Sequence, residues 1–162
     1  QRARREWVNL NDVVRGALGL LTPALQTDDI ACDLRLADPL PKIMADQTQM
    51  HQVTLSLLQR ARQATASAGD PGQLDVETSA AGEIVRLSVL DNGPTPDAAT
   101  IEHLFDAPPA DAPAESSASL YVCRTLVEVH GGHISAQARS DGPGLRVTVE
   151  LPAGVGPLGR GV

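Results

Sequence analysis

Two stretches of this chain have the pattern of paired strands joined by short glycine-containing turns. In QLDVETSAAGEIVRLSVLDNG the turn falls at Ala81-Gly82, and in GHISAQARSDGPGLRVTVELP it falls at SDGPG. Apolar residues that alternate with polar ones place a strand's side chains on one buried face, and such turns connect neighbouring strands. The chain is therefore predicted to contain two β-hairpins, which makes a purely helical fold untenable.

Three other stretches carry apolar residues at the spacing of a helix. The first follows Asn11, a predicted N-cap, and the second follows Asp46, another predicted N-cap, and runs to about Ala66. The third begins at Leu120 and ends in His-Gly-Gly, a glycine C-cap. A short helix is also predicted at residues 98–105.

The stretch DIACDLRLA alternates as a half-buried strand does, so hairpins, a further strand and helices share one chain. That combination predicts an α+β fold: a two-layer α/β sandwich with a mixed sheet of about five strands and three main helices on one face. The predicted domain covers residues 8–153. A loop rich in proline, alanine and serine is predicted at about residues 106–119, and a flexible tail at residues 154–162.

Charge and composition exclude several classes of function. The formal net charge is −7 with no basic face in the pattern, and aromatic residues are scarce, so no contact with nucleic acid is expected. No apolar run approaches the roughly 20 residues that span a bilayer, and no membrane contact is expected. Cys32 and Cys123 have the spacing of reduced packing thiols, and the HGGH unit favours a structural turn over a metal site.

The stretches MADQTQMHQVTLSLLQRARQAT, VLDNGPTP, LFDAP and LYVCRTLVEVHGGHISAQARSDGPGLRVTVELP occur in an order that resembles the ATP-binding domain of bacterial sensor histidine kinases. That domain belongs to the GHKL superfamily of ATPases and has the Bergerat fold. The resemblance covers residues 8–152, and RTLVEVHGGHISAQ is its strongest segment. It implies that residues 1–7 are a linker from an absent upstream helical dimerisation domain.

The resemblance assigns a first motif, the asparagine box, to the helix that follows Asp46. The family pattern is similar to N-L-L-x-N-A, in which the second asparagine holds Mg²⁺, whereas this chain has S-L-L-Q-R-A with Ser56 and Arg60 at the two asparagine positions. A guanidinium has only donors and cannot ligate a cation, so magnesium binding is predicted to be absent. Arg60 is then either a solvated helix residue or a cation that stands in for the metal and reaches phosphate.

A second motif, D-x-G-x-G, falls on the octet VLDNGPTP. By resemblance Asp91 accepts a hydrogen bond from the adenine amino group and Gly93 lets the backbone approach the base. Thr95 stands where the family has its second glycine, and a β-branched residue narrows that corner.

The last two motifs frame the predicted lid loop. Phe105 matches a phenylalanine before the lid, but no lysine or arginine occurs between Arg86 and Arg124 to meet a triphosphate. Where the family is similar to G-T-G-L-G-L, this chain has E-S-S-A-S-L. Glu115, Ser117 and Ser119 replace the three glycines, and Leu120 keeps the final position.

These departures lead to an expectation of a cytoplasmic, degenerate ATPase-like domain of a two-component histidine kinase or phosphotransferase. Such a domain would have weak or no Mg-ATP binding and no catalytic residue. It would contact its own upstream phosphotransfer domain and a response-regulator receiver domain, in a full-length homodimer. Two alternatives stay open: a functional ATP-binding domain that phosphorylates a histidine on the missing helical domain, and a small-molecule sensor built on the emptied pocket.

Overall fold

The computed structural model describes residues 4–67, 71–111, 118–156 and 159–160. Its main feature is a five-stranded sheet in the order β2-β4-β5-β7-β6. The strands are β2 (Ile30–Arg35), β4 (Gly72–Ala81), β5 (Ile84–Asp91), β6 (His133–Ala138) and β7 (Leu145–Pro152). Only β2 and β4 run parallel and the other pairs are antiparallel, so the predicted mixed sheet is confirmed.

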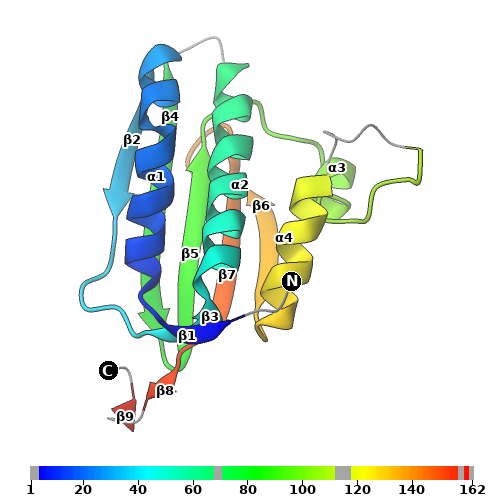
Figure 1. Cartoon of the computed structure of the whole chain (residues 1–162). Coiled ribbons are helices and arrows are strands. Elements are labelled where there is room, and N and C mark those ends of the chain that lie inside the picture. Colours follow the sequence, from blue (N-terminus) through cyan, green and yellow to red (C-terminus); the bar gives the residue numbers. More distant parts are fainter. Residues whose placement is uncertain (1–3, 68–70, 112–117, 157–158, 161–162) are drawn as a thin grey trace.

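Three long helices cover one face of this sheet, α1 (Leu10–Thr27), α2 (Gln47–Ala66) and α4 (Ala118–Val129), as Figure 1 shows. Figure 1 places α2 between the other two, over the middle of the sheet. The layers confirm the predicted two-layer α+β sandwich. No described helix is long and apolar enough to cross a membrane.

The start of α1 corrects one prediction. The N-cap is Asn9, whose side chain accepts a hydrogen bond from the backbone N–H of Asn11. Asn11 is instead a buried residue of the first turn: its Nδ2 donates to the Ala37 carbonyl, and its Oδ1 accepts from the Thr78 hydroxyl. A buried amide needs such partners, and they are remote in sequence.

The predicted cap of α2 is confirmed, because Asp46 Oδ1 accepts from the Gln49 N–H at 2.9 Å. The glycine C-cap of α4 is also confirmed: Gly131 has φ +78°, and the Gly132 N–H donates to the Val127 carbonyl. The helix predicted at residues 98–105 is shorter than expected, since α3 covers Ala98–Glu102.

Four short strands near the two ends of the described chain and before α2 complete the fold. β1 (Arg5–Val8) begins inside the stretch predicted as a linker and pairs antiparallel with β3 (Ile43–Asp46). In the tail that was predicted to be flexible, two-residue strands β8 (Val155–Gly156) and β9 (Gly159–Arg160) pair antiparallel. The predicted boundaries of linker, domain and tail stay predictions.

The two faces of the sheet differ in chemistry. The face under the helices is an aliphatic core to which β5 contributes Val85, Leu87 and Val89. The opposite face, called the outer face below, carries the charged and hydroxyl side chains of alternate positions, including the pairs Arg86–Glu150 and Ser88–Thr148. Because strand side chains alternate between faces, Asp91 falls on the core side and Leu90 on the outer side.

Candidate functional site

Asp91 ends β5 beneath α2 and is completely buried, with 0 % of its surface exposed. The N–H of Gly93 donates to Asp91 Oδ1 at 2.9 Å and closes the turn. Asn92 fixes the same turn from the side, because its Oδ1 accepts from the Gln73 N–H and its Nδ2 donates to the Pro71 carbonyl. The octet that the sequence presented as either a turn or a ligand contact is therefore a tightly bonded turn that holds a buried carboxylate.

Arg60 of α2 reaches this carboxylate. Its Nη1 donates to Asp91 Oδ2 at 2.7 Å, and the arginine side chain is 19 % exposed. This geometry corrects the first interpretation drawn from the sequence, because Arg60 is no freely solvated surface residue and its cation is directed at the carboxylate predicted to read adenine. A contact of Arg60 with phosphate stays a prediction. A part-buried charge needs a partner, and Asp91 is the acidic group within reach.

Gly93 is required by a close approach of the turn to α2. A Cβ atom at this position would overlap the backbone carbonyl of Ala64. The glycine therefore serves the packing of the turn against the helix, which is a demand of the fold itself. Any contact of the Gly93 backbone with a ligand stays a prediction.

Thr95 does more than narrow the corner of the site. Its Oγ1 accepts a hydrogen bond from the Gly144 N–H at 3.0 Å, and Gly144 lies in the turn before β7. The residue that replaces the family's second glycine thus connects the Asp91 turn to the last hairpin.

Ser56 lies one turn before Arg60 but faces a different neighbour. That neighbour is Cys123 of α4, whose thiol donates to the Val53 carbonyl of α2 at 3.9 Å. Burial raises the pKa of the Cys123 thiol to about 11, and the contact with Ser56 opposes that rise in part. Cys123 is thus an unreactive thiol at the contact between α2 and α4, and it is not paired with the other cysteine.

Of the remaining predicted site residues, two lie in the hydrophobic core, and for the others the structure describes no side chain. Phe105 and Leu120 are both buried in the hydrophobic core. Ser119 belongs to the first turn of α4, its side chain is not described, and Ser117 lies outside the described residues, as does Glu115. The structure therefore brings together Arg60, Asp91, Gly93 and Thr95 and does not bring Ser56 to them.

The start of the predicted lid carries an ion pair. His103 Nδ1 lies 2.8 Å from Asp106 Oδ2, and this hydrogen bond raises the pKa of His103 above its usual value. Arg124 of α4 lies 3.8 Å from the other oxygen of Asp106 and over the ring of Tyr121. Asp106, at the start of the predicted lid, is therefore flanked by a histidine and an arginine.

Two residues of the last hairpin were missed by sequence reasoning. Arg139 Nη1 donates to the backbone carbonyl of Asp91 at 3.0 Å, and a Cβ atom on Gly144 would overlap that same carbonyl. The SDGPG turn was visible in the sequence, but nothing local indicated that it packs against a residue about fifty positions earlier.

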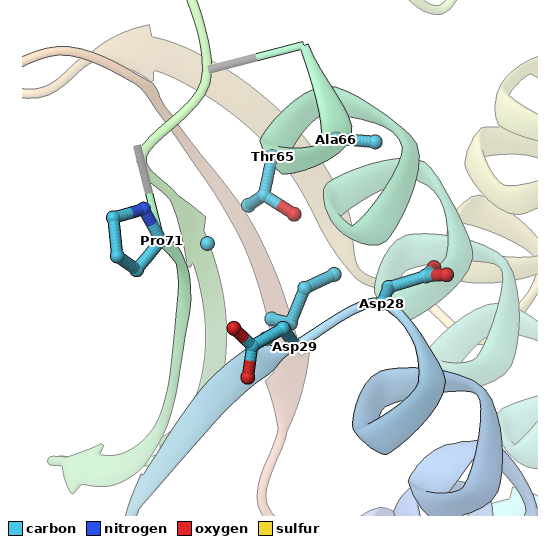
Figure 2. A pocket seen from close by; sticks show the side chains of 7 residues that line it. Asp28, Asp29, Thr65, Ala66 and Pro71 are labelled. Atoms are coloured by element: carbon cyan, nitrogen blue, oxygen red, sulfur yellow. The ribbon is translucent and has the colours of Figure 1, made fainter. Parts of the chain in front are cut away.

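A cavity of about 270 Å³ lies beyond the C-terminal ends of α1 and α2, and Figure 2 shows Asp28 and Asp29 on one side of it and Thr65 and Ala66 on the other. Asp28 is paired with Arg62 at 2.6 Å. None of the predicted site residues lines this cavity. Its carboxylates make it unsuited to a phosphate group.

The donor set around Asp91 does not fit magnesium ATP. Arg60 supplies no oxygen at the position of the metal ligand, and it already binds the carboxylate oxygen that the turn leaves open. Among the described residues, no group of three or more His, Cys, Asp or Glu side chains could hold a metal ion.

Comparison with known proteins finds relatives of this chain and of its fold. A family model described as "Histidine kinase-, DNA gyrase B-, and HSP90-like ATPase" matches residues 45–155. The sensor protein KdpD of Escherichia coli K12 is 33 % identical over 95 % of this chain, and the sensor histidine kinase ZraS of Escherichia coli O157:H7 is 34 % identical over 91 %. The chain spans only 17 % and 31 % of the length of these two relatives.

Among solved structures, the nucleotide-free catalytic domain of histidine kinase ThkA superposes with a TM-score of 0.81 at 25 % identity, over 93 % of this chain and 96 % of that one. ThkA has also been solved in complex with the response regulator protein TrrA, where the match has a TM-score of 0.76 and covers 42 % of the ThkA chain.

Proposed function

The chain belongs to the family of histidine kinase-, DNA gyrase B- and HSP90-like ATPases, and on that premise we propose that it is a degenerate domain of the sensor histidine kinase type. In this proposal the domain binds Mg-ATP weakly or not at all and acts by contact. The observation that supports it most directly is the Arg60–Asp91 ion pair of 2.7 Å at a fully buried carboxylate.

This ion pair works against adenine binding. An adenine amino group would be a second donor to Asp91, and it would have to share or displace a guanidinium that lies against Oδ2. The guanidinium brings a positive charge to the buried carboxylate, whereas the adenine amino group is neutral, so displacement of Arg60 by the amino group would leave a part-buried charge unpaired and is unfavourable. Arg60 therefore acts as an internal occupant of the base site.

Phosphoryl transfer is disfavoured by the loss of a metal ligand at position 60 and by the motif changes around it. Phosphoryl transfer depends on positioning and on neutralising charge with a metal ion. An arginine replaces the amide oxygen for that metal, and serine and glutamate replace the glycines of the phosphate loop. The residues of this chain thus hold the carboxylate and the turn in place, and no step of a transfer reaction is assigned to them.

The proposed partners follow from the relatives. We propose contacts with an upstream helical dimerisation and phosphotransfer domain and with a response-regulator receiver, in the cytoplasm and within a homodimer of the full-length protein. The complex of ThkA with its response regulator supports the second contact.

A functional ATP site is the second candidate, and the retained turn of Asp91 and Gly93 is the observation that favours it. Titration of ATP and of ADP, each with and without Mg²⁺, separates the two candidates by calorimetry and thermal shift. We expect no Mg-dependent stabilisation at millimolar nucleotide. Micromolar, Mg-dependent affinity would overturn the degenerate interpretation.

A substitution tests the role of Arg60. Arg60→Asn removes the cation from Asp91 and restores an amide at the position of the family's metal ligand, so we expect nucleotide affinity to rise. Arg62→Asn is the matched control, because Arg62 lies on the same helix and pairs with Asp28. Equal affinities for the two variants would show that Arg60 does not block the site.

A further inference from the structure

Arg139 follows β6 and lies on the outer face of the sheet, with a side chain that is only 13 % exposed. Its Nη1 donates to the backbone carbonyl of Asp91 and lies 3.6 Å from the carboxylate of Asp75. Its Nε and Nη2 donate to the two oxygens of Asp141, each at 3.0 Å, and this contact raises the pKa of Arg139. A planar guanidinium bound on two sides is held in one orientation.

Residues 139–144 are called the hairpin tip below. Gly144, at the opposite end of the tip from Arg139, also contacts the Asp91 turn. Gly144 packs against the Asp91 carbonyl so closely that no side chain fits, at φ +120°, and its N–H donates to Thr95 Oγ1. The tip is closed by a hydrogen bond from the Arg139 N–H to the Gly144 carbonyl. Asp91 and Thr95, which flank the turn, are thus each bonded to the tip.

We propose that the hairpin tip is a clamp that sets the position of Asp91 from the outer face of the sheet, with Arg139 and Thr95 as its positioning residues. The clamp acts on the backbone carbonyl of Asp91, whereas Arg60 acts on its carboxylate on the core side. This inference goes beyond the proposed function, because the clamp orders the Asp91 turn whether or not a nucleotide binds there.

The outer face provides a matched control. Arg139 and Arg146 both line a cavity of about 390 Å³ on the outer face. Arg146 contacts Glu77 at 3.4 Å, and within the described part of the chain its side chain makes no hydrogen bond or ion pair with the Asp91 turn. Arg139→Gln and Arg146→Gln therefore remove the same charge from the same cavity, and only the first removes a bond to Asp91.

The experiment is amide hydrogen exchange followed by NMR on the whole chain without nucleotide. The reporters are the Gly93 N–H, which donates to Asp91 Oδ1, and the Gly144 N–H, which donates to Thr95. Exchange at the Leu57 amide in the core of α2 measures global opening and normalises both. A loss of one hydrogen bond corresponds to roughly a three- to tenfold faster exchange.

We expect Arg139→Gln to speed normalised exchange at Gly93 by roughly that factor, and Arg146→Gln to leave it unchanged. Thr95→Val keeps the shape of the side chain and removes Oγ1, so it should speed exchange at both reporters. Unchanged normalised exchange at Gly93 in Arg139→Gln and Thr95→Val, or equal effects of the two arginine variants, would overturn the clamp. If Arg139→Gln does not fold, Thr95→Val decides alone. Nucleotide titration is a separate measurement, so failure of the proposed function leaves this result readable.

Discussion

Two buried carboxylates are associated with α2, and they are satisfied by different kinds of donor. Asp46 precedes the first turn and accepts backbone N–H bonds from Arg4 and Gln49, while its own N–H donates to His130 Nε2. Asp91 lies beneath the later turns and accepts from one backbone N–H and from the side chain of Arg60.

This difference suggests that Asp46 has a structural role, whereas Asp91 lies where a ligand-binding carboxylate is predicted. Backbone donors are present whatever the side chains are, so the bonds at Asp46 belong to the fold. The Arg60 donor belongs to one side chain and is removable by one substitution. A carboxylate completed in this way has an exchangeable partner, which is what a ligand-binding position requires.

The largest expected effect tests how tightly the Asp91 turn packs on α2. Gly93→Ala places a methyl group against the Ala64 carbonyl, and we expect a loss of about 3 kcal/mol in the free energy of unfolding, because backbone cannot yield as a side chain does. Urea denaturation measures it. Gly19→Ala is the control: nothing lies near that helical position, and a gain of about 0.5–1 kcal/mol is expected. A neutral Gly93→Ala would contradict the close approach.

The next effect breaks the ion pair from the acidic side. Asp91→Ala leaves the part-buried guanidinium of Arg60 and the Gly93 N–H without their acceptor, and we expect a loss of about 2–3 kcal/mol. The double variant Arg60→Met with Asp91→Ala should recover most of it, since no charge is left unpaired. Additive losses in the double variant would mean that the pair is not coupled.

A smaller loss is expected at the other carboxylate. Asp46→Ala removes the N-cap of α2, and we expect a loss of about 1–2 kcal/mol. No substitution of a single partner side chain should rescue it, because the donors are backbone groups. Asp46→Ser, which can still cap a helix, is the control and should retain most of the stability. Equal losses for alanine and serine would place the role of Asp46 elsewhere.

The smallest effect is a dependence of stability on pH. The N–H bonds from Arg4 and then Gln49 hold the pKa of Asp46 below its ordinary value of 3.8. A carboxyl with a depressed folded pKa stabilises the protein above its unfolded pKa and loses that contribution as pH falls through the folded pKa. The unfolding free energy should therefore fall between about pH 5 and pH 3, and less steeply in Asp46→Asn.

His103 has a raised pKa, so its contribution to stability depends on pH in the opposite direction to that of Asp46. Its contribution is present below its ordinary pKa of 6.5 and is lost as pH rises through the folded value. His103→Gln should remove a shallow decline of the unfolding free energy above pH 6.5 and leave its fall at acid pH unchanged. If His103→Gln also removed the loss of stability at acid pH, the assignment of that loss to Asp46 would be contradicted.

Local patterns in the sequence were enough for most of the fold. The cap at Asp46 and the glycine C-cap at Gly131 each depend on a few neighbouring residues, and both were predicted correctly. The first hairpin was also predicted, but its turn was placed one residue early, because Ala81 ends β4 and the turn is Gly82-Glu83. The cap of α1 was placed two residues late, at Asn11 instead of Asn9. Both are asparagines, and only the remote partners of Asn11 decide which one is buried.

The sequence named candidate residues for the site but could not give their contacts. Asp91 and Gly93 were identified by motif, whereas the partner of Asp91 is 31 positions earlier and depends on how α2 is rotated over the sheet. Arg60 and Arg62 are two residues apart and have acidic partners on different elements. Helical spacing gives the relative direction of two side chains, and the absolute direction comes only from packing.

The first described strand has a mechanical consequence. Arg5 donates to the Val129 carbonyl at the end of α4, and Arg4 is bonded to Asp46 just before α2 begins. A pull on the chain at β1 therefore loads the first turn of α2 and the last turn of α4 together. A 20-residue helix is about 30 Å long and stiff along its axis. Tension that enters at Asp46 would therefore be delivered along α2 to Ala64, the residue whose carbonyl presses on Gly93.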